Sequence, residues 1–118
     1  MAESYLELLK REFTAEDHSF LITLRTNLTW DKEVFSKLIA AMEVCCKASE
    51  RRDTLERWLV VGFWYMSSWV RDWTTHPNFP RPEPSEYYEN ALRRLDELAF
   101  WFFSGGCMYE DGHVSDPL

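Results

Sequence analysis

Apolar residues recur every three or four positions along most of this chain, which is the spacing of an amphipathic helix. The pattern predicts a first helix over residues 4–12 and a second one that ends near Asn27. Thr14 followed by Asp17 resembles a capping motif and is expected to open the second helix. Because neither Gly nor Pro separates the two segments, a single bent helix is the alternative.

Two further helices have clear end signals. Thr29 or Asp31 is expected to cap a third helix that runs to about Ala48. Ser85 is expected to cap the last helix, and Gly105 is well placed to end it, since Gly readily adopts the left-handed conformation of a helix C-terminus. The charged side chains of that helix fall largely outside its apolar stripe, Arg94 and Glu97 among them.

The segment 54–74 carries the densest hydrophobic pattern. Asp53, with Glu56 three residues later, predicts its N-terminus. Its apolar face holds Leu55, Trp58, Leu59, Phe63, Met66, Trp69, Val70 and Trp73. Gly62 costs about 1 kcal/mol in a helix interior, and we expect the close approach of another helix to compensate. Further apolar residues lie off this face, which favours a central, buried position for the helix.

A proline-rich connector, residues 77–84, separates this helix from the last one and cannot be helical. We expect Phe79 to pin it to the core. The predicted fold is therefore all-α: a single-domain bundle of four or five helices over residues 1–106, built around a central Trp-rich helix. Residues 107–118 are predicted to form an acidic C-terminal tail.

Composition narrows the class of protein. The 118 residues are 46% hydrophobic and 16% aromatic, which excludes a disordered or low-complexity chain. The formal net charge of -7 argues against direct nucleic-acid binding, which needs Lys and Arg to neutralise phosphates. No apolar run reaches the roughly 18 residues of a membrane span. Three cysteines, Cys45, Cys46 and Cys107, are odd in number and favour buried thiols in a reducing cytoplasm.

Catalytic motifs are absent from the sequence. It contains no Gly-rich phosphate loop, no nucleophile elbow and no paired-histidine zinc motif, so we expect a non-enzymatic protein without a cofactor. Asp72 and His76, four positions apart, are the best candidates for metal binding or acid–base chemistry. The simpler interpretation of this pair is a solvated helix end, where His also interacts favourably with the helix dipole.

The aromatic cluster of the segment 54–74 allows two interpretations. Trp58, Trp69 and Trp73 lie on the main apolar face and are predicted to be core residues. The alternative is that they line an aromatic pocket for a small ligand or an organic cation.

Five other side chains are candidates for a partner-binding surface: Trp64, Arg71, Arg57, Trp101 and Phe100. The first three lie away from the main apolar face, and the last two fall outside the stripe of the last helix. Trp and Arg are over-represented among binding hot spots. An exposed aromatic patch at either place would mark a partner site or a homodimer contact, whereas a second buried face is the alternative.

Charge is concentrated towards the C-terminus, since the segment after His76 carries eight acidic and three basic side chains. An acidic field raises the rate of association with a basic partner, although solubility alone also accounts for it. The leading hypothesis is therefore a cytoplasmic protein-binding module, an inhibitor or adaptor of a larger basic partner. A small-ligand-binding or sensing domain is the alternative, and a metal-binding protein is the third.

Overall fold

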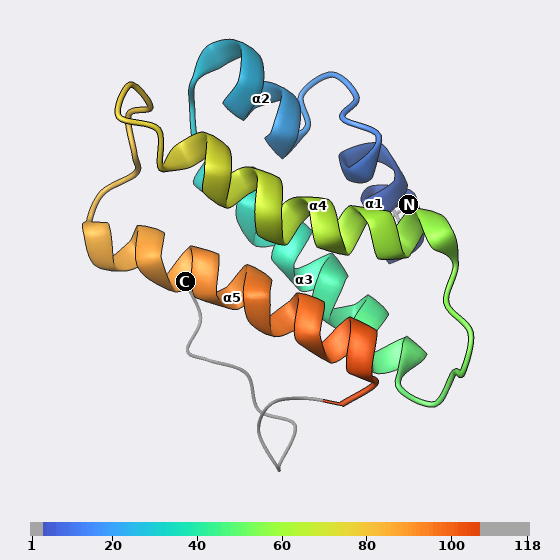
Figure 1. Ribbon diagram of the computed structural model, residues 1–118. Helices are drawn as coiled ribbons and strands as arrows, with labels where there is room; N and C mark the ends of the chain where they lie inside the picture. Colours follow the sequence, from blue (N-terminus) through green and yellow to red (C-terminus); the bar gives the residue numbers. More distant parts are fainter. Residues whose placement is uncertain (1–3, 107–118) are drawn as a thin grey trace.

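Five helices and no strand make up residues 4–106, the part of the chain that the computed structural model describes (Figure 1). They are α1 (Tyr5–Phe13), α2 (Phe20–Asn27), α3 (Lys32–Ser49), α4 (Arg57–Thr74) and α5 (Ser85–Ser104). The prediction of a single all-α domain is confirmed. None of these helices is long and apolar enough to cross a membrane.

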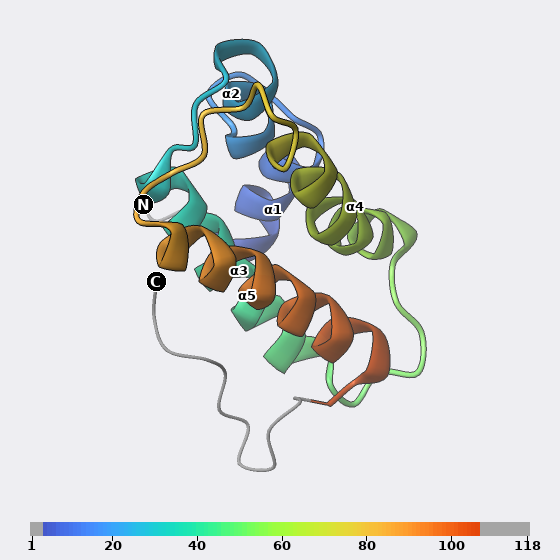
Figure 2. The same ribbon diagram turned by 60° about the vertical axis from the view of Figure 1, so that its left-hand side comes forward.

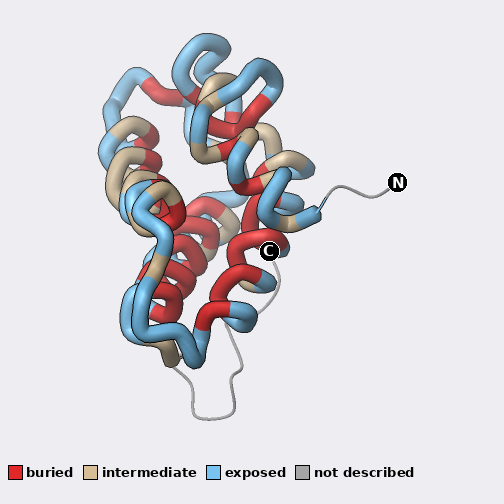
Figure 3. Tube along the Cα trace, turned by 90° about the vertical axis from the view of Figure 1, so that its right-hand side faces the viewer, coloured by how far each residue is buried: buried red, intermediate tan, exposed pale blue. Residues whose placement is uncertain are grey.

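The helices are arranged in two layers. α4 and α5 lie side by side and run in opposite directions, and α3 lies behind them (Figures 1 and 2). α1 packs mainly on α3, while α2 sits across one end of the array, near the C-terminal end of α4. Buried residues face the interior between the layers (Figure 3). This arrangement leaves the outer side of α4 next to α2 without a covering helix.

Aromatic rings dominate the end of the core below α2. Trp30 and Phe35 lie with their ring centroids 4.9 Å apart, and Phe20 lies 4.9 Å from each of them. The indole nitrogen of Trp30 donates a hydrogen bond to the hydroxyl of Tyr87 at 3.1 Å. These contacts tie α2 and α3 to the start of α5. Phe79 is buried, so the predicted anchor of the proline-rich connector is confirmed.

Gly62 has the expected reason for its place in α4. A Cβ atom at this position would lie 2.1 Å from Cδ2 of Phe13 and 2.4 Å from its Cγ, far inside van der Waals contact. The absence of a side chain lets the end of α1 press directly against α4. The predicted close approach of another helix is confirmed.

The first two helices are separate, and the predicted cap between them was wrong. Thr14 ends α1, with its hydroxyl bonded to the carbonyl of Lys10 at 2.7 Å. Ser19 caps α2 instead, and its side chain accepts a hydrogen bond from the amide of Ile22. Ala15 and the residues after it form a turn between the two helices rather than a helical start.

The start of α4 also differs from the prediction. The helix begins at Arg57, and neither Asp53 nor Glu56 makes a capping bond from its side chain. The carboxylate of Glu56 instead accepts a hydrogen bond from the indole of Trp58 at 2.6 Å, which removes it from the capping geometry. Asp31 caps α3, and Gly105, with φ at 80°, ends α5, as predicted. The predicted cap of α5 was wrong, because Ser85 is the first residue of the helix and Pro84, which has no side-chain hydrogen bond to offer, takes the N-cap position.

Two charged residues of α5 were placed wrongly by the helical pattern. Arg94 and Glu97 are buried, with their charged groups 4.0 Å apart, whereas the sequence suggests an outer position. Both neighbouring helices, α3 and α4, contact α5, so the helix has a wider buried arc than one apolar stripe indicates. Mutual pairing offsets part of the cost of burying the two charges.

The tryptophan-rich helix is not enclosed on all sides. Its inner residues, such as Phe63 and Met66, are fully buried, but Trp58, Trp69 and Trp73 are only half-buried. Val61 and Trp64 are exposed over 52% and 57% of their surfaces. The expectation that this helix is a central, buried element therefore fails for its outer face. 

Cys45 and Cys46 are buried free thiols, as predicted, and burial raises the pKa of the Cys45 thiol. The third cysteine, Cys107, and the predicted acidic tail at 107–118 lie outside the described residues.

Candidate functional site

An open groove of about 660 Å³ runs along the uncovered side of α4. α4 forms one wall, and α2 with the turn that follows α1 forms the other. The lining residues are Phe13, Thr14, Ala15, Leu21, Ile22, Arg25, Arg57, Trp58, Val61, Gly62, Tyr65 and Trp69. Most of these side chains are apolar or aromatic, and a volume of this size is in the range of binding pockets for organic ligands, roughly 300–1,000 Å³.

Stacked rings form the α4 wall of the groove. Tyr65 and Trp69 lie one helical turn apart, with centroids 5.5 Å apart and ring planes inclined by 13°. Trp69 continues the stack onto Trp73, at 5.3 Å and 13°. The indole nitrogen of Trp73 donates to the backbone carbonyl of Leu24 in α2 at 3.0 Å. The stack therefore has a fixed orientation before any ligand arrives, which lowers the entropic cost of binding.

Trp58 is held at the far end of the same wall. The ring of Phe13 meets it edge-on at 6.3 Å, and its indole nitrogen is engaged by Glu56. The ammonium group of Lys10 lies 5.9 Å from its centroid. Gly62 is part of this end of the groove, because its missing side chain lets Phe13 form the floor.

Two arginines, Arg25 of α2 and Arg57 at the start of α4, are the charged residues among those that line the groove. Both are exposed. Within residues 4–106 neither guanidinium has an ion-pair partner. The lining therefore combines an apolar interior with two positive charges that are available to a carboxylate or another anion.

The groove continues onto an exposed apolar shoulder. Val61 lines the groove, and Trp64, one turn further along α4, is the most exposed of the large hydrophobic residues in the described chain. The rings of Trp64 and Tyr65 lie 6.5 Å apart, edge to face. Of the residues predicted to form an interface, Arg57 lines the groove and Trp64 lies on the shoulder beside it.

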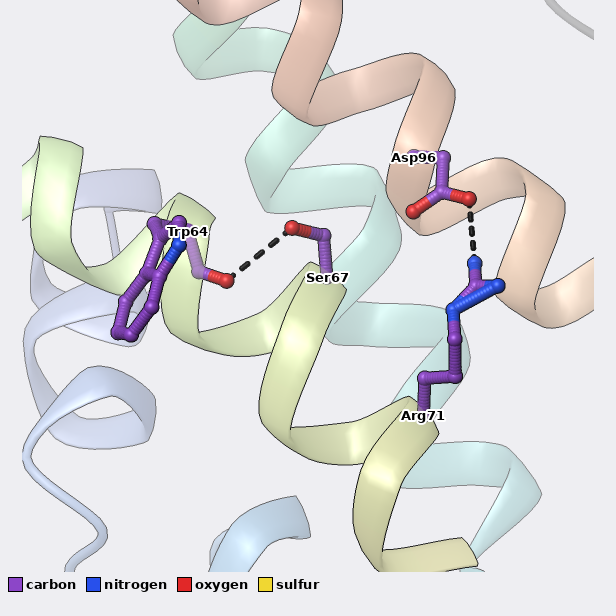
Figure 4. Close-up of polar contacts among 4 residues, drawn as sticks. All are labelled: Trp64, Ser67, Arg71 and Asp96. Carbon is purple, nitrogen blue, oxygen red and sulfur yellow. Dashed lines mark hydrogen bonds and ion pairs between the residues drawn. The ribbon is translucent and has the colours of Figure 1, made fainter. Parts of the chain in front are cut away.

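The other predicted partner residues do not join this surface. Arg71 reaches across to α5 and pairs with Asp96, whereas the indole of Trp64 extends to the other side of α4 (Figure 4). Phe100 of α5 is exposed. Trp101 is only 2% exposed, and its indole nitrogen donates to Glu50 at 3.1 Å, so the suggestion that it lies at the surface was wrong.

A smaller pocket of about 240 Å³ lies at the C-terminal end of α4. It is lined by Leu28, Asp72, Trp73, His76, Asn78 and Phe79. Asp72 and His76, the candidate metal ligands, therefore do lie beside one cavity. Among residues 4–106, however, no three His, Cys, Asp or Glu side chains come together, and a zinc site uses at least three protein ligands.

The sequence did not reveal the α2 side of the groove. Neither Ile22 nor Arg25 was a candidate site residue, because this wall exists only once α2 is laid against α4. An arginine in the last turn of a short apolar helix is common and carries no signal by itself.

The chain matches no known family model, and no curated protein and no solved structure is significantly similar to it.

Proposed function

We propose that this protein is a non-catalytic binding module that receives an amphipathic helix of a partner protein in the groove between α2 and α4. The observation that carries the proposal is the lining of that groove: rigid aromatic rings, a contiguous exposed shoulder at Val61 and Trp64, and two arginines without partners among residues 4–106. A mostly apolar concave surface with a few charged groups is typical of helix-in-groove recognition.

The dimensions of the wall fit a short helix. From Arg57 to Trp69, α4 rises by about 18 Å, the length of roughly three helical turns. A docked helix of that length presents apolar anchors at positions i, i+3 or i+4, and i+7. Aromatic residues that are already fixed in place, such as Tyr65 and Trp69, provide contact area at low entropic cost.

Charge defines the flanks of the docked segment. Arg25 and Arg57 favour acidic side chains on the partner helix, next to its apolar anchors. The net charge of -7 on the whole chain acts over longer distances and favours a partner that is basic elsewhere. The protein would then act as an inhibitor or adaptor that captures one exposed helix of a larger partner.

Selection from a library of 16-residue peptides tests the proposal directly. We expect peptides selected on the wild-type protein to be amphipathic and to carry acidic residues beside the apolar anchors. Val61→Glu should weaken their binding at least about tenfold, because it places a charge on the groove wall. Val44→Glu is the matched control, since Val44 is an exposed valine of α3, 47% accessible, and lies outside the groove.

Charge reversal separates docking in the groove from non-specific hydrophobic capture. A second selection on the Arg25→Glu/Arg57→Glu double variant should give peptides with basic flanks in place of acidic ones. The proposal is wrong if Val61→Glu leaves binding unchanged, or if both selections yield the same charge pattern. Binding of a second copy of the chain would appear instead as a doubling of the 14.1 kDa mass in solution.

The same lining supports a second candidate function, binding of a small amphipathic carboxylate. The volume suits such a ligand, and either arginine would pair with its carboxylate. Dodecanoate and its uncharged methyl ester distinguish this function: saturable quenching of tryptophan fluorescence by the acid, but not by the ester, favours it. Equal quenching by both compounds counts against a specific carboxylate site.

A further inference from the structure

The small pocket at the C-terminal end of α4 has features that the larger groove lacks. We propose that it binds an organic cation, an ammonium group carried either by a free small molecule or by a lysine side chain of a partner. Two aromatic residues, Trp73 and Phe79, and one acidic residue, Asp72, line this pocket. This inference does not depend on the function proposed for the groove.

Trp73 provides the aromatic surface. One of its faces is covered by Trp69, which lies one turn earlier in α4 at 5.3 Å. Trp73 lines the pocket together with His76 and Phe79, which follow it in the chain. The hydrogen bond from its indole nitrogen to Leu24 fixes the ring. The face of an indole is the best aromatic partner for a cation.

Asp72 is the acidic residue of the lining and gives the pocket its sign of charge. It is exposed, and the structure shows no ion pair for it within residues 4–106. His76 is held by its neighbour, because the backbone amide of Asn78 donates to its Nδ1 at 3.2 Å. In that arrangement Nδ1 is an acceptor, and the bond orients the imidazole ring beside the pocket.

Leu28 lines the pocket from the end of α2, in an unfavourable backbone conformation. It ends α2 with φ at 51°, in the left-handed region, where Gly or Asn is the favoured residue. Its side chain is 43% exposed and yet faces the cavity. Leu28 therefore costs free energy twice, through its left-handed backbone and through the exposure of its apolar side chain. In return it provides an apolar wall for the methyl or methylene groups that a ligand carries beside its charge.

The lining favours an organic cation over a metal ion. Aromatic and aliphatic walls offer no ligands, and among the lining residues a bare divalent cation would find only the side chains of Asp72, His76 and Asn78. An ammonium group with alkyl substituents is weakly hydrated and uses the same apolar walls as contact surface.

Titration with choline tests the inference, with 3,3-dimethyl-1-butanol, its uncharged carbon analogue, as the matched ligand. The readout is the indole N–H signal of Trp73 in the NMR spectrum, assigned by its loss in Trp73→Phe. We expect a saturable shift with choline at constant ionic strength, and binding of the uncharged analogue about tenfold weaker. Asp72→Asn should weaken choline binding about two- to fivefold, the usual effect of one exposed ion pair.

Asp53→Asn is the control variant, because it removes the same charge from the opposite end of α4 and should leave choline binding unchanged. N-acetyl-lysine methylamide and its trimethylated form identify the source of the cation. Tighter binding of these lysine derivatives than of choline indicates a partner side chain, and the reverse order indicates a free ligand. The inference is overturned if Trp73 shows no saturable shift with any of these cations, or if the uncharged analogue binds as tightly as choline.

Discussion

The contact between Gly62 and Phe13 can be tested with Gly62→Ala, because helix propensity and overpacking change the free energy of unfolding in opposite directions. Gly62→Ala adds one methyl group to the middle of α4. On helix propensity alone the change stabilises the protein by about 1 kcal/mol. In the structure, however, the new Cβ would lie 2.1 to 2.4 Å from three atoms along one edge of the Phe13 ring. Because Cγ is one of these atoms, rotation of the ring tip does not relieve the clash, and the whole side chain must move.

The expected cost follows from the contacts of that ring. Overpacking by one methyl group costs about 1–3 kcal/mol. Phe13 also meets Phe63 edge-on at 5.8 Å and Trp58 at 6.3 Å, and each aromatic pair contributes about 0.5–1.5 kcal/mol. If the displaced ring loses both aromatic contacts, subtracting the gain in helix propensity leaves Gly62→Ala expected to lower the free energy of unfolding by about 1–5 kcal/mol.

Urea unfolding followed by far-UV circular dichroism measures this change, provided that the m-value stays constant. The same substitution in a Phe13→Ala background is the decisive comparison, because the obstructing ring is then absent. There we expect Gly62→Ala to stabilise the protein by up to about 1 kcal/mol. A stabilising effect in the wild-type background, or the same destabilisation in both backgrounds, would refute the packing of Phe13 against α4 and with it the floor of the groove.

Two further predictions concern a helix cap and a buried thiol. Ser19→Ala removes the cap of α2 and should lower the free energy of unfolding by about 1 kcal/mol in the same urea assay. Ser36→Ala, at an exposed position within α3, is the control and should not lower it. Equal effects of the two substitutions would contradict the cap. Burial raises the pKa of the Cys45 thiol above its ordinary value of 9.0, so the folded chain holds this proton more tightly than the unfolded chain does. The protonated thiol therefore contributes stability that is fully present below pH 9.0 and is lost as the pH rises through the folded pKa. Urea midpoints on either side of pH 9.0 should therefore fall more steeply in the wild type than in Cys45→Ala, and parallel slopes would count against the shift.

Of the candidate site, the sequence supplied residues but not their grouping. Trp58 and Trp69 were named as pocket residues in the alternative to a pure core, and both line the groove. Trp73 lines the other pocket, beside Asp72 and His76. Trp101 was offered as a surface residue because it falls outside one apolar stripe, but a helix that packs between two others buries a wider arc.

Local physics determined most of the helices. The spacing of apolar residues, the cap at Asp31, the glycine at the end of α5 and the prolines before it act over a few neighbouring positions, so the sequence alone specifies them. It also specified that Gly62 needs a close neighbour. Tertiary packing alone decided that Phe13 is this neighbour and which side of α4 stays uncovered. It also decided that Arg25 and Arg57 line the same groove as the aromatic rings of α4. Those features join residues far apart in the chain, and a helical repeat carries no information about how one helix is laid against another.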